Sequence, residues 1–185
     1  MLNYLSAELW RMTRRRLDLI WCAAYLLLVG VVALSWTGAS LHQTMEGFRD
    51  FLVIGLYLGY PLAALADGEA RRLGTLRNEV SYGLPWGRIY LGKLCSALLA
   101  GTVLFLLTAA VFFAVGFPLS EHRQIQPDRL LLAWAGLLTG TLSAFPRYIG
   151  AVGFAHLLCF SLRSSGLGAV VYYGYLTFGE LFLSA

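Results

Sequence analysis

The chain has 185 residues, of which 58% are hydrophobic and 13% charged, and its formal net charge is +4. Soluble domains carry about 25% charged residues, so this composition argues against a soluble protein. The positive residues lie in short segments between apolar runs and form no basic face, which argues against a nucleic-acid-binding protein.

Long apolar runs predict an all-α integral membrane protein, with residues 1–185 forming one transmembrane domain. Leu19–Met45 and Leu94–Ser120 contain no Asp, Glu, Lys or Arg. Each run is longer than the roughly 20 residues that a helix needs to cross hydrocarbon. We expect about five transmembrane helices and an interfacial helix at the amino terminus.

Residues 1–16 predict that interfacial helix, lying on the inner membrane surface. Leu2, Leu5, Leu9 and Met12 form an apolar stripe at helical spacing, and Asn3, Ser6, Glu8 and Arg11 surround the other side. The triplet Arg14, Arg15 and Arg16 follows and would anchor the helix to lipid headgroups.

The first two predicted spans are Leu17–Trp36 and Asp50–Ala66. Between them Thr37–Arg49 is predicted as a short outer loop. A basic segment, Asp67–Lys93, then separates the second span from the third. Short loops rich in Lys and Arg stay in the cytoplasm, so we expect this segment and the amino terminus on the cytoplasmic side of a multi-pass protein of the cell membrane.

The third span is predicted at Leu94–Phe117, ending at Pro118, and an outer loop follows it. Leu130–Arg163 is too long for one straight crossing, and Pro146 interrupts it. We therefore expect a tilted or interfacial outer helix at Leu130–Ala144 and the fourth span at Phe145–Leu162. The alternative is two full crossings.

The fifth span is predicted at Leu167–Leu183, after an inner turn at Arg163–Gly166. Counting up from this turn, Arg147 and Glu180 reach a similar depth near the outer hydrocarbon boundary. They are candidates for an intramembrane charged pair or gate, since ionisable residues at such depths are often functional. Alternatively, Arg147 reaches the outer headgroups by itself and Glu180 marks a span end.

Aromatic and small residues offer weaker signals. The aromatic group could line a pathway, but packing is favoured; its members are Tyr57, Tyr60, Tyr172, Tyr173, Tyr175 and Phe178. Glycines recur at helix-packing spacing, at Gly55 and Gly59 and at Gly136 and Gly140.

Catalytic and metal-binding signals are poor, and we expect no enzyme activity, no metal and no cofactor in this chain. The histidines His42, His122 and His156 and the cysteines Cys22, Cys95 and Cys159 stand apart without metal-ligand spacing. Gly87–Lys93 is a near miss to a phosphate-binding loop, but Leu94 stands where Ser or Thr is needed. Any nucleotide hydrolysis would therefore belong to another subunit.

The basic segment also carries a family resemblance. Its successive parts Glu69–Glu79, Ser81–Gly83 and Arg88–Lys93 resemble the first cytoplasmic loop of type-two ATP-binding-cassette transporter permeases. The resemblance extends to the amphipathic start, the order of spans and the Arg-Ser-Ser-Gly turn before the fifth span. Trp86 departs from the family pattern, and the family usually has six spans where we expect five. Either a sixth lies beyond residue 185 or the protein works in a shortened form.

The resemblance implies a coupling helix in this loop, which inserts into a cleft of a separate ATPase subunit. It places the coupling role on Glu69, Arg72, Gly74, Thr75, Leu76, Arg77 and Asn78. The implied partners are an ABC ATPase subunit, a second permease copy or homologous permease subunit, and the lipid bilayer. The expected function is the permease subunit of an ATP-driven exporter; the alternative is a non-transporting membrane scaffold or regulatory subunit of such a complex.

Overall fold

The protein is described by a computed structural model in which helices make up almost all of the described chain, and no strand occurs in that part. The description covers every residue except 1, 73–79, 121–126, 163 and 184–185, and it leaves out the side chains of residues 2, 17–18, 54, 68–72, 127 and 180–183. The all-helical prediction is thus confirmed for the described residues.

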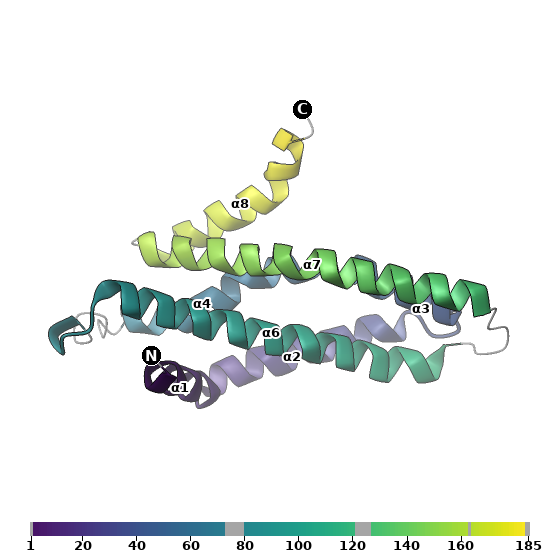
Figure 1. Cartoon of the computed structure of the whole chain (residues 1–185), viewed down its shortest axis with the longest axis horizontal. Helices are drawn as coiled ribbons and strands as arrows, with labels where there is room; N and C mark the ends of the chain where they lie inside the picture. The colour runs from purple at the N-terminus through teal and green to yellow at the C-terminus, as the bar shows by residue number, and fades with distance from the viewer. Residues whose placement is uncertain (1, 73–79, 121–126, 163, 184–185) are drawn as a thin grey trace.

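Two long antiparallel helices, α6 (Trp86–Leu119) and α7 (Pro127–Ser161), run side by side along the molecule (Figure 1). α2 (Arg16–Leu34) packs on α6, and α4 (Gly59–Arg72) packs on both α6 and α7. We call the end of the bundle where α4 leads towards α6 the loop end. The other end holds α3 (Leu41–Phe51) and the start of α7.

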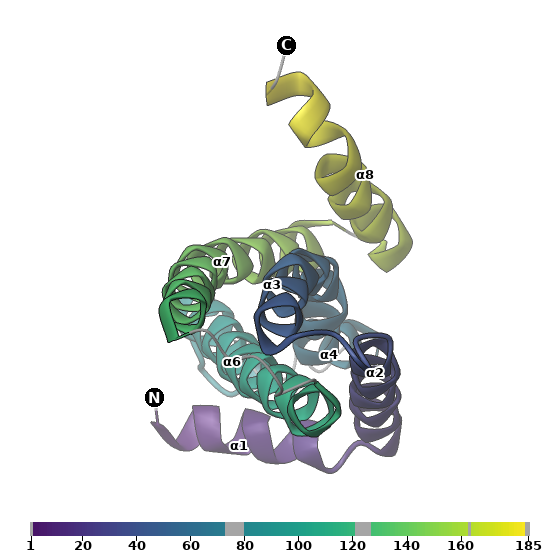
Figure 2. The ribbon, with the colours of Figure 1, turned by 90° about the vertical axis from the view of Figure 1, so that its right-hand side faces the viewer.

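Helix α1 (Leu2–Thr13) lies across the loop end and crosses the direction of the long helices (Figure 2). The amphipathic helix is observed, but the predicted polar side is wrong at Glu8. Glu8 is buried, and so is Met12 one turn later, while Tyr4 lies against Gly92 of α6. Positions four apart share one face of a helix, so the inward face runs through Tyr4, Glu8 and Met12.

The predicted outer loop Thr37–Arg49 is wrong in its second half, which forms α3. The Ser40 side chain accepts from the backbone N–H of Gln43, and the Gln43 side chain accepts from the backbone N–H of Ser40. This reciprocal capping box satisfies two free donors and starts a helix. Phe48 and Phe51 then pack against Phe112 of α6.

The second predicted span, Asp50–Ala66, is a broken helix instead of a straight one. A 3₁₀-helix, η1 (Leu52–Leu58), joins α3 to α4, and the two α-helical arms are bent by 40°. Pro61 explains the break, because it has no N–H to offer to the carbonyl of Tyr57 four residues earlier.

Tyrosines of α8 (Ser165–Leu183) bind the carbonyls at this break. The Tyr173 hydroxyl donates to Tyr57 O at 3.2 Å, and the buried Tyr172 hydroxyl donates to Leu56 O at 2.6 Å. Tyr60 in turn donates to Ser165 O at the start of α8. The predicted packing of the aromatic group is therefore confirmed for Tyr57, Tyr60, Tyr172 and Tyr173, whose rings contact one another.

The predicted division of residues 130–162 at Pro146 is wrong, and so is the alternative of two crossings. α7 is one continuous helix of 35 residues with Pro146 inside it. A proline in a helix interior costs about 3 kcal/mol. Contacts along the length of α7 with α3, η1, α4 and α6 outweigh that cost.

Helices extend into both ends of the basic segment Asp67–Lys93. α4 continues to Arg72, and α6 begins at Trp86, eight residues before the predicted start at Leu94. α8 leaves the bundle, and its carboxyl end projects away from α7 in both ribbon views (Figures 1 and 2).

Within the described residues, α6 is long and apolar enough to cross a membrane. The bent pair Leu41–Phe51 and Gly55–Asp67 makes a second candidate if it counts as one span, and Leu19–Leu34 is apolar but shorter. Helices therefore stand where the five spans were predicted, but length and composition support a crossing for one or two of them.

Candidate functional site

The predicted coupling residues fall mostly outside the described part of the chain. Gly74–Asn78 lie in the segment that the structure does not describe. Glu69 and Arg72 lie on the last turns of α4, where the side chains are not described. Their role stays a prediction, but the helices on either side of the segment are described in detail.

Lys93 lies at the α6 root of the segment, and its side chain is shielded from solvent. Its Nζ lies 3.3 Å from Oε1 of Glu8 on α1 and 3.5 Å from the carbonyl oxygen of Ala66 on α4. The exposed fractions of the two charged side chains are 1% and 2%. Charges so deeply buried require partners, because water no longer solvates them.

Glu8 has a second cationic partner on its own helix. Arg11 Nη1 lies 3.1 Å from the same carboxylate oxygen, Oε1, and is partly open to solvent. α1 comes close to α6 because Gly92 has no side chain; a Cβ at Gly92 would overlap the ring of Tyr4. A small residue beside Lys93 thus lets Glu8 reach the ammonium group.

Asp67 lies at the α4 root of the segment and faces α7. Its Oδ2 lies 2.6 Å from Nδ1 of His156, and both side chains are buried. The two atoms are close but not aligned as a hydrogen bond, and neither side chain hydrogen-bonds to another described group. The contact becomes an ion pair when the imidazole is protonated.

Aromatic rings enclose His156. The Tyr90 ring centroid lies 4.7 Å from that of the imidazole, and the Phe160 centroid lies 5.9 Å from it. These rings come from α6 and α7 and keep the Asp67–His156 pair out of solvent. At the same end, Arg15 Nη1 donates to Leu65 O of α4 at 2.8 Å. Within the described residues, no three His, Cys, Asp or Glu side chains gather as a metal site.

We call Glu8, Asp67, Lys93 and His156 the root cluster. It ties both ends of the basic segment to the bundle: Lys93 to α1, Asp67 to α7, and the two roots to each other through Ala66. Movement of either root therefore has to move α1 or α7, or else break a buried polar contact.

The root cluster was missed from the sequence. Glu8 was placed on the polar side of its helix, and His156 was considered a lone histidine. A usable signal was the Tyr4–Glu8–Met12 spacing, which puts a carboxylate on the same face as two large side chains. His156 gave no comparable signal, because its partner Asp67 is 89 positions away.

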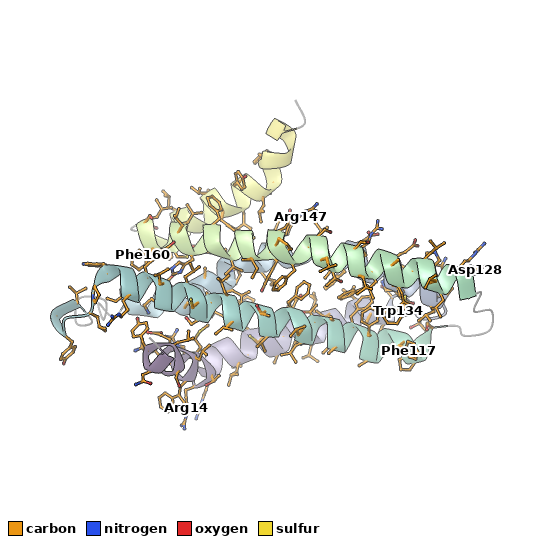
Figure 3. All side chains as sticks on the ribbon, viewed as in Figure 1. Arg14, Phe117, Asp128, Trp134, Arg147 and Phe160 are labelled. Atoms are coloured by element: carbon orange, nitrogen blue, oxygen red, sulfur yellow. The ribbon has the colours of Figure 1, made fainter. Side chains whose placement is uncertain are left out.

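A second site lies at mid-length of the bundle, between α3 and η1 on one side and α7 on the other. It is a cavity of about 480 Å³. Its lining consists of Arg49, Asp50, Leu52, Val53, Leu56, Thr139, Gly140, Ser143, Ala144 and Arg147. Figure 3 shows Arg147 half-way along α7, pointing away from α6. The Glu180 side chain is outside the described residues, so its predicted pairing with Arg147 stays a prediction.

Close packing against neighbouring side chains explains one glycine in each of the two spaced pairs. A Cβ at Gly59 would overlap the Tyr172 hydroxyl, and one at Gly140 would lie 2.6 Å from Cγ of Arg49. A Cβ at Gly55 or Gly136 would meet nothing within 4 Å. Gly59 and Gly140 thus permit close packing, whereas Gly55 and Gly136, the other glycine of each pair, do not contribute to it.

Comparisons of the chain with protein-family models, with curated proteins and with solved structures return no match.

Proposed function

We propose that this protein is a membrane-spanning permease subunit of an ATP-driven exporter, coupled to a separate ATPase subunit through residues 67–93. The observation that carries the proposal is the root cluster. Both ends of the basic segment are held by buried ionisable side chains that contact different helices, Lys93 on α1 and Asp67 on α7. A solvated surface loop has no need of such anchors.

The distribution of polarity supports a bilayer around the bundle. Large apolar side chains are exposed on several helices, among them Trp21, Leu27, Leu106, Leu131, Leu142 and Val170. Contiguous exposed apolar surface marks contact with a membrane or a partner. Glu8, Asp67, Lys93 and His156 are buried instead, an arrangement that suits a protein surrounded by lipid.

The root cluster suits the transmission of force. An ATPase that closes on the segment would pull on α4 and α6 where they enter the bundle. The buried contacts resist separation, since breaking a buried pair by removing one partner costs about 3–5 kcal/mol. α1 and α7 would therefore move with the segment, and α7 borders the mid-bundle cavity.

The broken helix supports a transport path beside that cavity. Transporters often place substrate sites where a helix is interrupted near the middle of the membrane. Here η1 interrupts the α3–α4 path, and Leu52, Val53 and Leu56 of η1 line the cavity. We expect a second permease copy or a homologous subunit to complete the path.

Purification of the tagged protein from its native membrane in a mild detergent tests the proposal. We expect an ATPase subunit to co-purify in stoichiometric amount, and its hydrolysis of ATP to depend on the permease. A complex that contains other membrane proteins but no ATPase would contradict the proposal and favour the scaffold or regulatory alternative.

A further inference from the structure

The mid-bundle cavity has two faces of different chemistry. Leu52, Val53, Leu56 and Ala144 give it an apolar side. Arg49 and Arg147 supply two positive charges against the single negative charge of Asp50, and Thr139 and Ser143 supply hydroxyl groups. The excess positive charge favours an anionic group in the cavity.

Arg49 is held in place by the surface of α7. Its Cγ and Cδ lie against Gly140, where a Cβ would come within 2.6 Å and 3.0 Å of them. Its Nε is 3.9 Å from Oδ1 of Asp50, and both side chains are largely exposed, so this pair contributes little. The Arg49 guanidinium is therefore available to another anion.

Arg147 is the one Asp, Glu, Lys or Arg residue between Leu130 and Leu162 in the sequence. Among the described side chains, no carboxylate lies within ion-pair distance of Arg147. Arginine in such an apolar setting is expensive unless it meets a partner, which makes it a candidate binding residue. The guanidinium group suits phosphate and carboxylate because its donors can bind two oxygens at once.

The cavity opens sideways. Val53 and Asp50 are exposed at its edge, and Arg147 points out from the side of α7 at mid-length (Figure 3). A smaller cavity of about 190 Å³ between α3 and α7 also has Arg49 in its lining. Glu46 lines this smaller cavity too, and its Oε1 lies 3.6 Å from Nδ1 of His42. Access from the side of the bundle suits a molecule that is itself dissolved in the bilayer.

We propose that this cavity binds an amphiphile with one anionic headgroup, phosphate or carboxylate, and an alkyl chain. Arg49 and Arg147 hold the headgroup, and the apolar residues of η1 contact the first part of the chain. That this amphiphile is the transported substrate rests on the proposed function; the binding does not.

Binding is measured by native mass spectrometry of the full chain in a neutral detergent, with three probes. Oleoyl lysophosphatidic acid carries both the phosphate and the chain, monooleoylglycerol carries the chain alone, and inorganic phosphate carries the anion alone. We expect one equivalent of lysophosphatidic acid to bind at least about tenfold more tightly than either other probe, because this probe alone supplies both the charged hydrogen bonds and the apolar contact.

Variants locate the site. Arg147→Gln and Arg49→Gln should each weaken lysophosphatidic acid binding by about tenfold, and Gly140→Ala should weaken it by displacing the stem of Arg49. Gly150→Ala, on the same helix with open space around the new methyl group, should bind like the parent. The arginines are exposed, so the variants should keep the parent melting temperature.

The proposal is overturned if the double variant Arg49→Gln/Arg147→Gln binds lysophosphatidic acid like the parent. Equal binding of monooleoylglycerol would remove the role of the anion, and equal binding of inorganic phosphate would remove that of the chain; either result overturns the proposal. A lack of lysophosphatidic acid binding would not contradict ATPase association, and a lack of ATPase association would not contradict this binding.

Discussion

Lys93 and Glu8 show how two charges can be accommodated inside this bundle. Each group has a partner of opposite sign at 3.3 Å, and the ammonium also approaches the Ala66 carbonyl. Arg11 at the edge of the cluster adds a second positive charge to the carboxylate. Because these contacts join α1, α4 and α6, a single substitution should affect all three helices.

Replacing Lys93 by Met should lower the free energy of unfolding by about 3 kcal/mol, since Glu8 would remain buried with Arg11 alone. Changing both residues to Met removes both charges and should recover much of that loss. Denaturation of the purified variants in detergent measures the effect. Losses that simply add in the double variant would mean that the two charges are not coupled.

At the scale of single residues, the sequence predicted the aromatic packing but not the root cluster. Lys93 and Glu8 are 85 positions apart, and their pairing depends on the angle at which α1 crosses α6. The apolar stripe at Leu2, Leu5, Leu9 and Met12 gave the helix but not its rotation. The close approach of Tyr4 to Gly92 and the burial of Glu8 and Met12 fix that rotation.

At the scale of elements, the break between α3 and α4 is the most distinctive feature. η1 bridges the two helices, and Pro61 removes a donor from the Tyr57 carbonyl, which Tyr173 of α8 replaces. Tyr172 of α8 adds a donor to the Leu56 carbonyl, which also accepts from the Gly59 N–H. Unpaired carbonyls away from water are costly, so α8 stabilises the break even though its far end leaves the bundle.

Tyr172→Phe should lower the free energy of unfolding by about 1 kcal/mol, because the hydrogen bond from the buried Tyr172 hydroxyl is lost while the Leu56 carbonyl keeps the Gly59 N–H. Tyr173→Phe is the matched comparison: its hydrogen bond is longer, at 3.2 Å against 2.6 Å, and less buried, so the loss should be smaller. Thermal unfolding of the two variants in one detergent gives the order. A larger loss for Tyr173→Phe would contradict the stronger contribution assigned to the Tyr172 hydroxyl.

Gly59→Ala should be destabilising by about 1–3 kcal/mol, since the new methyl group would overlap the Tyr172 hydroxyl and lie 3.2 Å from the backbone of Ala151. Gly55→Ala meets nothing within 4 Å and should be neutral or slightly stabilising. We expect a lower melting temperature for Gly59→Ala than for Gly55→Ala. Equal melting temperatures would show that α4 can shift away from α7 and α8 at little cost.

The elements that the sequence predicted well are those with continuous apolar runs. Leu17–Trp36 was expected as a helix, and α2 covers Arg16–Leu34. α3 was missed because its polar residues are typical of a loop, although the capping box at Ser40 and Gln43 indicates the start of a helix. At Pro146 a helix break was predicted but α7 is continuous, because tertiary packing overrides the local preference of proline.

At the scale of the whole molecule, buried ionisable side chains gather at the loop end, while large apolar side chains are exposed on several helices. α6, with 34 residues, is about 50 Å long at about 1.5 Å per residue, which exceeds the roughly 30 Å hydrocarbon thickness. If the bundle crosses a membrane as proposed, the loop end and its basic residues lie in the cytoplasm.

Labelling with a membrane-impermeant thiol reagent tests this orientation. In a variant without Cys22, Cys95 and Cys159, Asn78→Cys should stay unlabelled in intact cells and react after lysis. Glu46→Cys, on the exposed side of α3 at the other end, should be labelled in intact cells. Labelling of the cysteine at position 78 before lysis would reverse the proposed topology.

The central claim is that residues 67–93 receive the ATPase and pass its movement into the bundle. The most direct measurement is ATPase co-purification and ATP hydrolysis with the double variant Leu76→Asp/Arg77→Asp, next to Arg129→Asp, which reverses a charge at the opposite end. We expect the double variant to insert into the membrane normally but to lose the ATPase or its stimulated hydrolysis, while Arg129→Asp behaves like the parent. A double variant that assembles and hydrolyses ATP like the parent would contradict the coupling role.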